Sequence, residues 1–316
     1  MQTTISANRT FLMGLAMIAI ILFHHGWAII PGVTAFFSRF GLWGVDIFLF
    51  LSGFGCVYAL NKYTPPLFWR KRIARLLPTC LLAGVIVYCA DLFFQAERTM
   101  TYLPIRLLSI HRWYIQAILI CYCLCPLAYV ILSRYRVTGL LLMIAFAIVI
   151  EHLLPEVDVW KINWAFARIP VFLVGMYVAM FDLRMSFWQY IISGLCLAAA
   201  IVIRCRGGCY MFQWTYFLAA AMPFVCETLC RLRNIFMRLK VYHLIELFGI
   251  YSLEIYLIHE YSYWAIYEIS IPLWSKYLIF IFTVFGLCFT VKKTANFCQR
   301  AIFKAINEKA ENSFSR

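Results

Sequence analysis

Long apolar stretches recur along the chain between Phe11 and Val291, separated by short polar or basic segments. Each stretch is roughly 17–25 residues long, the length that a helix needs to cross the hydrocarbon of a bilayer. The pattern predicts about ten such helices, at residues 11–30, 40–60, 76–95, 113–132, 137–153, 165–181, 186–203, 210–229, 248–268 and 271–291. The predicted fold class is therefore all-α, a polytopic bundle of about ten transmembrane helices.

The segments between these helices are too short for a soluble domain of ~50 residues. We therefore predict one transmembrane domain over residues 1–291, followed by a cytoplasmic basic tail over residues 292–316. In the tail, apolar residues recur at helical spacing between basic ones, namely Ala295, Cys298, Ile302 and Ile306. This pattern suits an amphipathic helix on the anionic inner leaflet, and a solvated C-terminal extension is the alternative.

The composition agrees with a membrane protein, and the distribution of Lys and Arg along the chain explains the excess of positive charge. Hydrophobic residues make up 64% of the chain and charged residues 13%, too few to cover the surface of a soluble protein. The net charge is +14, and nineteen of the 28 Lys and Arg residues fall on the side that holds both termini, against eight on the other. This asymmetry follows the positive-inside rule. It predicts two cytoplasmic termini and no nucleic-acid partner.

Ionisable residues inside the predicted helices are the most informative positions, because each needs a partner, a wet cavity or a functional role in hydrocarbon. Those expected to lie deepest are His24, Asp46, Arg168, Glu254 and His259. An internal ion pair between Asp46 and Arg168 is the simplest structural explanation for two of them. A histidine in a helix bundle is likewise more often a hydrogen-bonded structural residue than a catalyst. The His, Cys, Asp and Glu residues show no spacing typical of a metal site, so none is predicted.

Six segments occur in a fixed order that resembles a known family. They are 13–24, which begins Met-Gly-Leu-Ala and ends Phe-His; 44–54, Gly-Val-Asp-Ile-Phe-Leu-Phe-Leu-Ser-Gly-Phe; 68–78, Phe-Trp-Arg-Lys-Arg-Ile-Ala-Arg-Leu-Leu-Pro; 111–115 with 126–127; 168–176; and 249–259. Over roughly residues 9–290 the chain resembles the acyltransferase-3 family, bacterial multi-span membrane O-acyltransferases that modify cell-surface glycans. One position departs from the pattern: the family has an arginine where this chain has Met13. Arg9, one helical turn earlier, is a candidate replacement.

The resemblance implies a reaction and the residues that perform it. An acyl group, commonly acetyl, would pass from acyl-CoA at the cytoplasmic side to a sugar hydroxyl of a surface or secreted glycan or glycolipid. Acyl-CoA would be a co-substrate, and no permanently bound cofactor is expected. The resemblance assigns Arg72 and Arg75 to donor binding, with Arg70 and Lys71 as lesser candidates, since guanidinium groups bind phosphate through paired hydrogen bonds. Arg9 is a further candidate for contact with acyl-CoA. If the positive-inside pattern alone is considered, these are ordinary topology-setting charges.

His24 is the candidate general base, because a neutral imidazole has a pKa near working pH and takes the hydroxyl proton as the oxygen attacks. Eleven helical rises, ~16 Å, separate Met13 from His24, which places His24 deep in the bilayer if Met13 is near the inner surface. We expect a passage between His24 and the Arg72–Arg75 pair. His25 points to another side of the helix and is the weaker candidate. Asp46, Arg168, Glu254 and His259 would be supporting polar residues.

The expected location is the bacterial cytoplasmic (inner) membrane, with a multi-pass topology and the lipid bilayer, acyl-CoA and a glycan or glycolipid as partners. The acyl group, the acceptor sugar and the oligomeric state stay open at this point. The alternative function is a transporter or flippase of a glycan or small solute, which also accounts for many spans with buried charges. A transporter needs no basic donor site, and it often has internal repeats, which this sequence lacks. A non-catalytic scaffold in a polymer-synthesis complex is a third interpretation.

Overall fold

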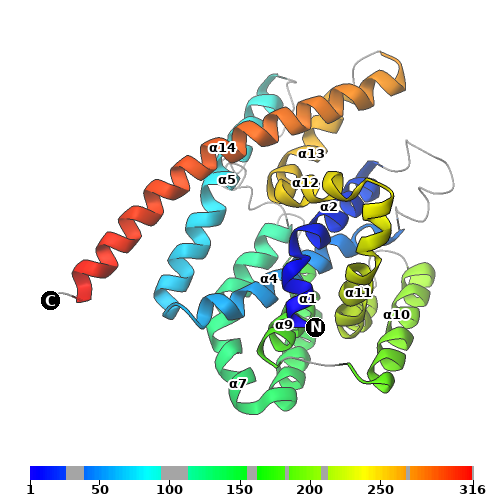
Figure 1. Cartoon of the computed structure of the whole chain (residues 1–316), viewed down its shortest axis with the longest axis vertical. Helices are drawn as coiled ribbons and strands as arrows, with labels where there is room; N and C mark the ends of the chain where they lie inside the picture. Colours follow the sequence, from blue (N-terminus) through cyan, green and yellow to red (C-terminus); the bar gives the residue numbers. More distant parts are fainter. Residues whose placement is uncertain are drawn as a thin grey trace. The chain divides into compact units, whose positions relative to one another are not determined.

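A computed structural model describes residues 1–25, 39–93, 113–154, 162–181, 185–207, 213–267 and 271–314. These residues are almost entirely helical and contain no strand (Figure 1). The helices are α1 (Gln2–Ala7), α2 (Arg9–His25), α4 (Trp43–Leu60), α5 (Pro65–Phe93), α7 (Trp113–Leu153), α8 (Ile162–Phe166), α9 (Ile169–Met180), α10 (Phe187–Gly207), α11 (Gln213–Arg238), α12 (Tyr242–Ile250), α13 (Ser252–Tyr267) and α14 (Leu273–Phe314). The all-α prediction is confirmed.

The apolar pattern locates the helices well. In the described part of the chain, 6 helices are long and apolar enough to cross a membrane, and Arg9–His24 is a shorter apolar helix. Every predicted span overlaps a described helix. Two predicted spans fall in α7, where Arg136 has the non-helical backbone angles φ 47° and ψ −122°. The chain therefore turns sharply inside α7, and its two arms meet at a bend (Figure 1).

The helices form two compact units, residues 1–63 with 113–250 and residues 64–112 with 251–316. In the first unit, α4 packs closely against α9. A Cβ added at Gly53 would overlap the carbonyl oxygen of Phe172, and one added at Gly175 would overlap that of Phe50. The two glycines thus allow the two backbones to touch, which is a common way for helices to associate in membranes.

Helix α2 is held in the same unit by further glycine contacts. A Cβ at Gly14 would overlap the backbone of Ile245 in α12, and a Cβ at Gly44 would overlap the carbonyl oxygen of Ala16. Gly44 of α4 therefore lies against the middle of α2. Close contacts on two sides fix the position of the helix that carries His24.

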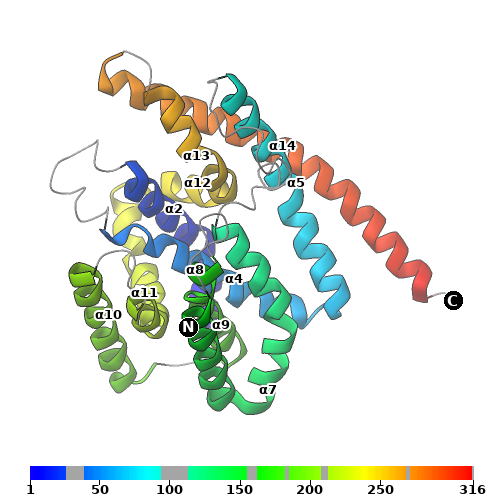
Figure 2. The same ribbon diagram turned by 180° about the vertical axis from the view of Figure 1, so that it is seen from behind.

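The second unit contains α5, α13 and α14 (Figure 2). Helix α14 is 42 residues long and passes residue 292 without a break, so the basic tail extends the last apolar helix. Its buried apolar residues lie on one face, at Phe280, Val284, Cys288, Val291 and Ala295. The apolar side of the tail therefore begins against other helices of this unit. The placement of the tail on a lipid leaflet stays a prediction.

Substitution of Gly175 by Ala is expected to lower stability by roughly 1–3 kcal/mol, because the added methyl group forces α4 and α9 apart. Gly194 of α10 is a matched control, since nothing lies within 4 Å of a Cβ added there. Gly194→Ala should be neutral or slightly stabilising, because alanine favours a helix over glycine. Thermal unfolding of the purified variants in detergent compares the two. Equal melting temperatures for the variants would contradict the close packing of α4 on α9.

Candidate functional site

A buried ion pair lies at the centre of the first unit. Asp46 is in the first turn of α4, and Arg168 directly precedes α9. Both side chains are completely buried, and the Arg168 Nε atom is 3.4 Å from the Asp46 Oδ1 atom. The pairing predicted for these two residues is confirmed. The pair neutralises two charges that would otherwise be costly to bury.

The guanidinium group of Arg168 is enclosed by tryptophans. Its central carbon lies 4.5 Å from the ring centroid of Trp113, 5.3 Å from that of Trp214 and 5.7 Å from that of Trp164. Aromatic faces attract cations, and this attraction grows when water is excluded. The Arg168 Nη1 atom also donates to the carbonyl oxygen of Trp164 at 3.3 Å. Tryptophans from three helices therefore hold Arg168 in place.

The break between α8 and α9 explains why Arg168 points inward. Pro170 lies at the start of α9, a position where its fixed φ favours a new helix. The break leaves backbone groups of α8 without helical partners, and the Thr215 hydroxyl donates to the carbonyl oxygen of Ala167 at 2.9 Å. This local geometry places Arg168 at a helix junction rather than along a helix face.

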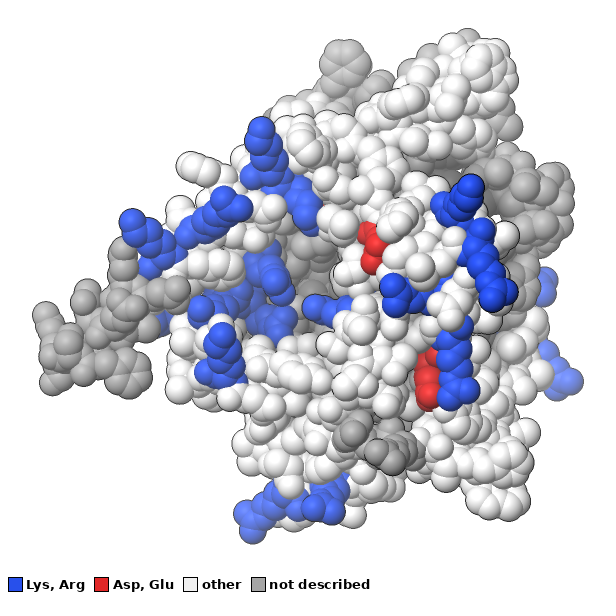
Figure 3. Space-filling view, in the orientation of Figure 1, with Lys and Arg blue, Asp and Glu red and all other residues white. Residues whose placement is uncertain are grey.

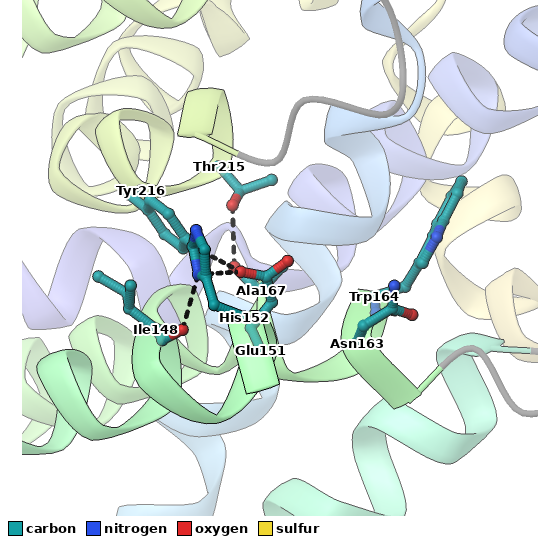
Figure 4. Close-up of polar contacts among 8 residues, drawn as sticks. All are labelled: Ile148, Glu151, His152, Asn163, Trp164, Ala167, Thr215 and Tyr216. Atoms are coloured by element: carbon teal, nitrogen blue, oxygen red, sulfur yellow. Dashed lines mark hydrogen bonds and ion pairs between the residues drawn. The ribbon is translucent and has the colours of Figure 1, made fainter. Parts of the chain in front are cut away.

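Glu151 and His152 at the end of α7 form a second polar cluster of the first unit (Figure 4). The Tyr216 hydroxyl donates to Glu151 Oε2 at 2.9 Å, and His152 Nδ1 lies 2.7 Å from the same oxygen. His152 Nδ1 is also 2.9 Å from the carbonyl oxygen of Ile148 in its own helix. Asn163 Oδ1 accepts from the backbone nitrogen of Trp164 nearby. The contact of Tyr216 with Glu151 ties α11 to α7, whereas the Asn163 contact lies within α8.

His24 lies in the last turn of α2, with its ring centroid 5.0 Å from that of Phe23. The side chain is partly exposed. Gly44 faces Ala16, and His24 is eight residues, ~12 Å, further along α2. Because α4 runs in the opposite direction, Asp46 lies on the side of Gly44 away from His24. The partner of Asp46 is Arg168, which favours the structural interpretation of Asp46.

Arg9 lies at the other end of α2, fifteen residues and ~22 Å from His24. Its Nη2 atom is 3.5 Å from the position that a Cβ of Gly55 would take. The guanidinium group of Arg9 therefore points to α4 within the first unit, on the side where the missing Cβ leaves room. Because α2 is unbroken between Met13 and His24, the distance along the helix between them is the predicted ~16 Å.

The predicted donor-binding residues lie in the second unit, in the first turns of α5. The Arg72 guanidinium carbon is 5.4 Å from the ring centroid of Phe68, and Arg72 is partly buried. Arg70 and Arg75 are exposed. The carbonyl oxygen of Arg75 accepts from Gln299 Nε2 of α14 at 2.8 Å. The sequence did not predict this contact between the basic motif and the C-terminal helix.

Glu254 and His259 on α13 each have structural partners. Lys292 Nζ lies 3.4 Å from Glu254 Oε2 and 5.2 Å from the ring centroid of Tyr251. His259 is completely buried, and its Nδ1 atom is 2.9 Å from the carbonyl oxygen of Ile255. A carbonyl oxygen only accepts, so this nitrogen carries a proton. These contacts favour a structural role for both residues, as the supporting polar groups expected from the sequence.

The candidate residues are thus divided between the two units. Arg9, His24, Asp46 and Arg168 belong to the first, and the α5 arginines with Glu254 and His259 belong to the second. The passage expected between His24 and the arginine pair stays a prediction. Among the residues that the structure describes, no group of three or more His, Cys, Asp or Glu side chains is placed to hold a metal ion.

Comparison with known families gives one match. A family model described as an acyltransferase domain matches residues 11–293. The matched range includes almost all of α2, all of α4 to α13 and the first half of α14, and with them His24, Arg72 and Arg75. No match was found among curated proteins or among solved structures.

Replacement of Asp46 by Asn is expected to destabilise the protein by about 3–5 kcal/mol, because the charge of Arg168 stays buried without its counterion. The double variant Asp46→Asn with Arg168→Met removes both charges and should recover much of this loss. Thermal unfolding in detergent measures the coupling between the two positions. Additive effects of the two substitutions would contradict an ion pair that stabilises the bundle.

Proposed function

The chain belongs to the acyltransferase-3 family, and from this membership we propose that it transfers an acyl group, most simply acetyl, from acyl-CoA to a sugar hydroxyl. The enzyme is a multi-pass membrane acyltransferase. The proposed donor binds at the cytoplasmic side of the bacterial inner membrane, and the proposed acceptor is a surface or secreted polysaccharide or a glycolipid. The match over residues 11–293 carries the proposal, because it contains both the basic motif and the histidine that this reaction needs.

Donor binding is assigned to the start of α5. Arg72 and Arg75 are three residues apart, so both side chains lie on one side of the helix. Guanidinium groups bind phosphates through paired hydrogen bonds and keep their charge at any physiological pH. Arg70 is exposed two residues before Arg72 and supplies a further positive charge. Arg9, in the first unit, is the remaining candidate for a contact with the donor.

Proton transfer is assigned to His24. As the sugar oxygen attacks the thioester carbonyl carbon, the imidazole takes the hydroxyl proton. The carbon–sulfur bond then breaks, the sugar ester forms, and the CoA thiolate leaves and takes up a proton. The partial exposure of His24 supports this assignment, because a general base must be reachable by the hydroxyl group it deprotonates.

Replacement of His24 by Ala is expected to reduce acyl transfer by about 100-fold to 10,000-fold, the range that a general base contributes. His25→Ala is the matched control, with the same substitution at the next position and little expected loss. Ester formed from radiolabelled acetyl-CoA, measured with both variants in native-like membranes, compares them. If His25→Ala abolishes transfer and His24→Ala leaves it intact, the base is assigned to the wrong histidine.

Replacement of Arg72 or Arg75 by Gln should raise the KM for acyl-CoA about tenfold each, because a charge-assisted contact with phosphate is lost. The kcat should change little, since neither side chain touches the reacting atoms. Arg134→Gln is the control, because Arg134 is exposed on the same predicted side of the membrane. Equal KM values for all three variants would exclude Arg72 and Arg75 from donor binding.

The proposed function itself is tested in the host cell. Deletion of the gene should remove ester-linked acyl groups from a surface glycan, as measured by mass spectrometry. The wild-type gene should restore the ester, and the His24→Ala gene should not. Unchanged esters in every glycan fraction would favour the transporter or scaffold.

A further inference from the structure

The C-terminal helix packs against the basic motif in the second unit. Gln299 Nε2 of α14 donates to the carbonyl oxygen of Arg75 at 2.8 Å. One turn further along, Lys71 Nζ lies 5.8 Å from the ring centroid of Phe303. Residue numbers rise along α14 as they fall along α5, so the two helices run antiparallel at this contact. The contact line passes directly through the motif assigned to donor binding.

The handedness of the two helices determines which of their other side chains lie on the same side of the helix pair. Each step along a right-handed helix turns the side chain by ~100°. In an antiparallel pair, the residues that directly follow the contact residues therefore turn to the same side. Arg72 follows Lys71 on α5, and Arg300 and Lys304 follow Gln299 and Phe303 on α14. Arg72, Arg300 and Lys304 thus flank the same side of the helix pair, with Arg75 at its edge.

This surface carries a strong positive charge. Residues 61–77 contain no Asp or Glu, and neither do residues 292–306. Arg75, Arg300 and Lys304 are exposed, and Arg72 is partly buried. Lys and Arg side chains gather over α5 and α14, without acidic side chains among them, in Figure 3. Like charges that gather in this way repel one another, so an anion that binds between them is favoured.

We propose that α14 supplies the second half of the donor site, with Arg300 and Lys304 joining Arg72 and Arg75 around the phosphates of acyl-CoA. The inference rests on the proposed function and goes beyond the family match, which ends at residue 293. CoA carries a pyrophosphate and a separate 3′-phosphate, so its charges are spread over a length that suits cations from two helices. A phosphatidylglycerol headgroup presents a single phosphate and does not match this spread.

The test uses the full-length enzyme in phosphatidylcholine nanodiscs, with acetyl-CoA as the probe. The double variant Arg300→Gln with Lys304→Gln should raise the KM for acetyl-CoA at least tenfold and leave kcat nearly unchanged. Both residues are exposed, and the melting temperature of the variant checks that the fold is kept. The control is Arg238→Gln with Lys240→Gln, which removes two exposed charges from the same predicted side and should leave KM within about twofold.

Three outcomes would overturn the inference. Equal rises in KM for the test and control variants would show a general charge effect. A rise that appears only when the nanodiscs contain phosphatidylglycerol would show that α14 binds lipid headgroups. An unchanged KM in the test variant, with a raised KM for Arg72→Gln, would exclude α14 and leave the proposed function intact. Failure of the wild-type enzyme to use or bind acetyl-CoA would instead contradict the proposed function.

Discussion

A charge buried in hydrocarbon must find its counterion inside the protein, and this constraint organises the first unit. Asp46 and Arg168 satisfy it for each other, and three tryptophans enclose the guanidinium group. The glycines between α4 and α9 bring the two helices close enough for the pair to form. Helix α2 packs on α4 at Gly44 and on α12 at Gly14. The position of His24 therefore depends on a core that the ion pair stabilises.

In the second unit, a buried carboxylate also has its counterion inside the protein, but on a different pair of helices. Lys292, near the end of the apolar part of α14, neutralises Glu254 of α13. Arg300 and Lys304 lie further along α14, in the part of the helix that contacts the basic start of α5. A single long helix therefore combines an apolar span, a counterion for a buried carboxylate and a basic surface.

The apolar spans were predictable because the thickness of hydrocarbon sets their length. The Asp46–Arg168 pair was predictable because a buried charge of each sign needs a partner. The partner of Glu254 was missed, since Lys292 lies just beyond the predicted end of its span. The contact of Gln299 with Arg75 was missed because the spacing of polar residues in the tail does not indicate which other helix they contact. The sharp turn at Arg136, by contrast, falls in the polar gap that the apolar pattern predicted between the spans 113–132 and 137–153.

The central claim is that a thioester is consumed at this membrane protein and that its acyl group becomes a sugar ester. The most direct measurement follows the release of free CoA thiol from acetyl-CoA by the purified protein in nanodiscs, with and without the host glycan. We expect thiol release that requires the glycan and equals the amount of ester formed. Movement of a glycan or solute across the membrane without any thiol release would contradict it.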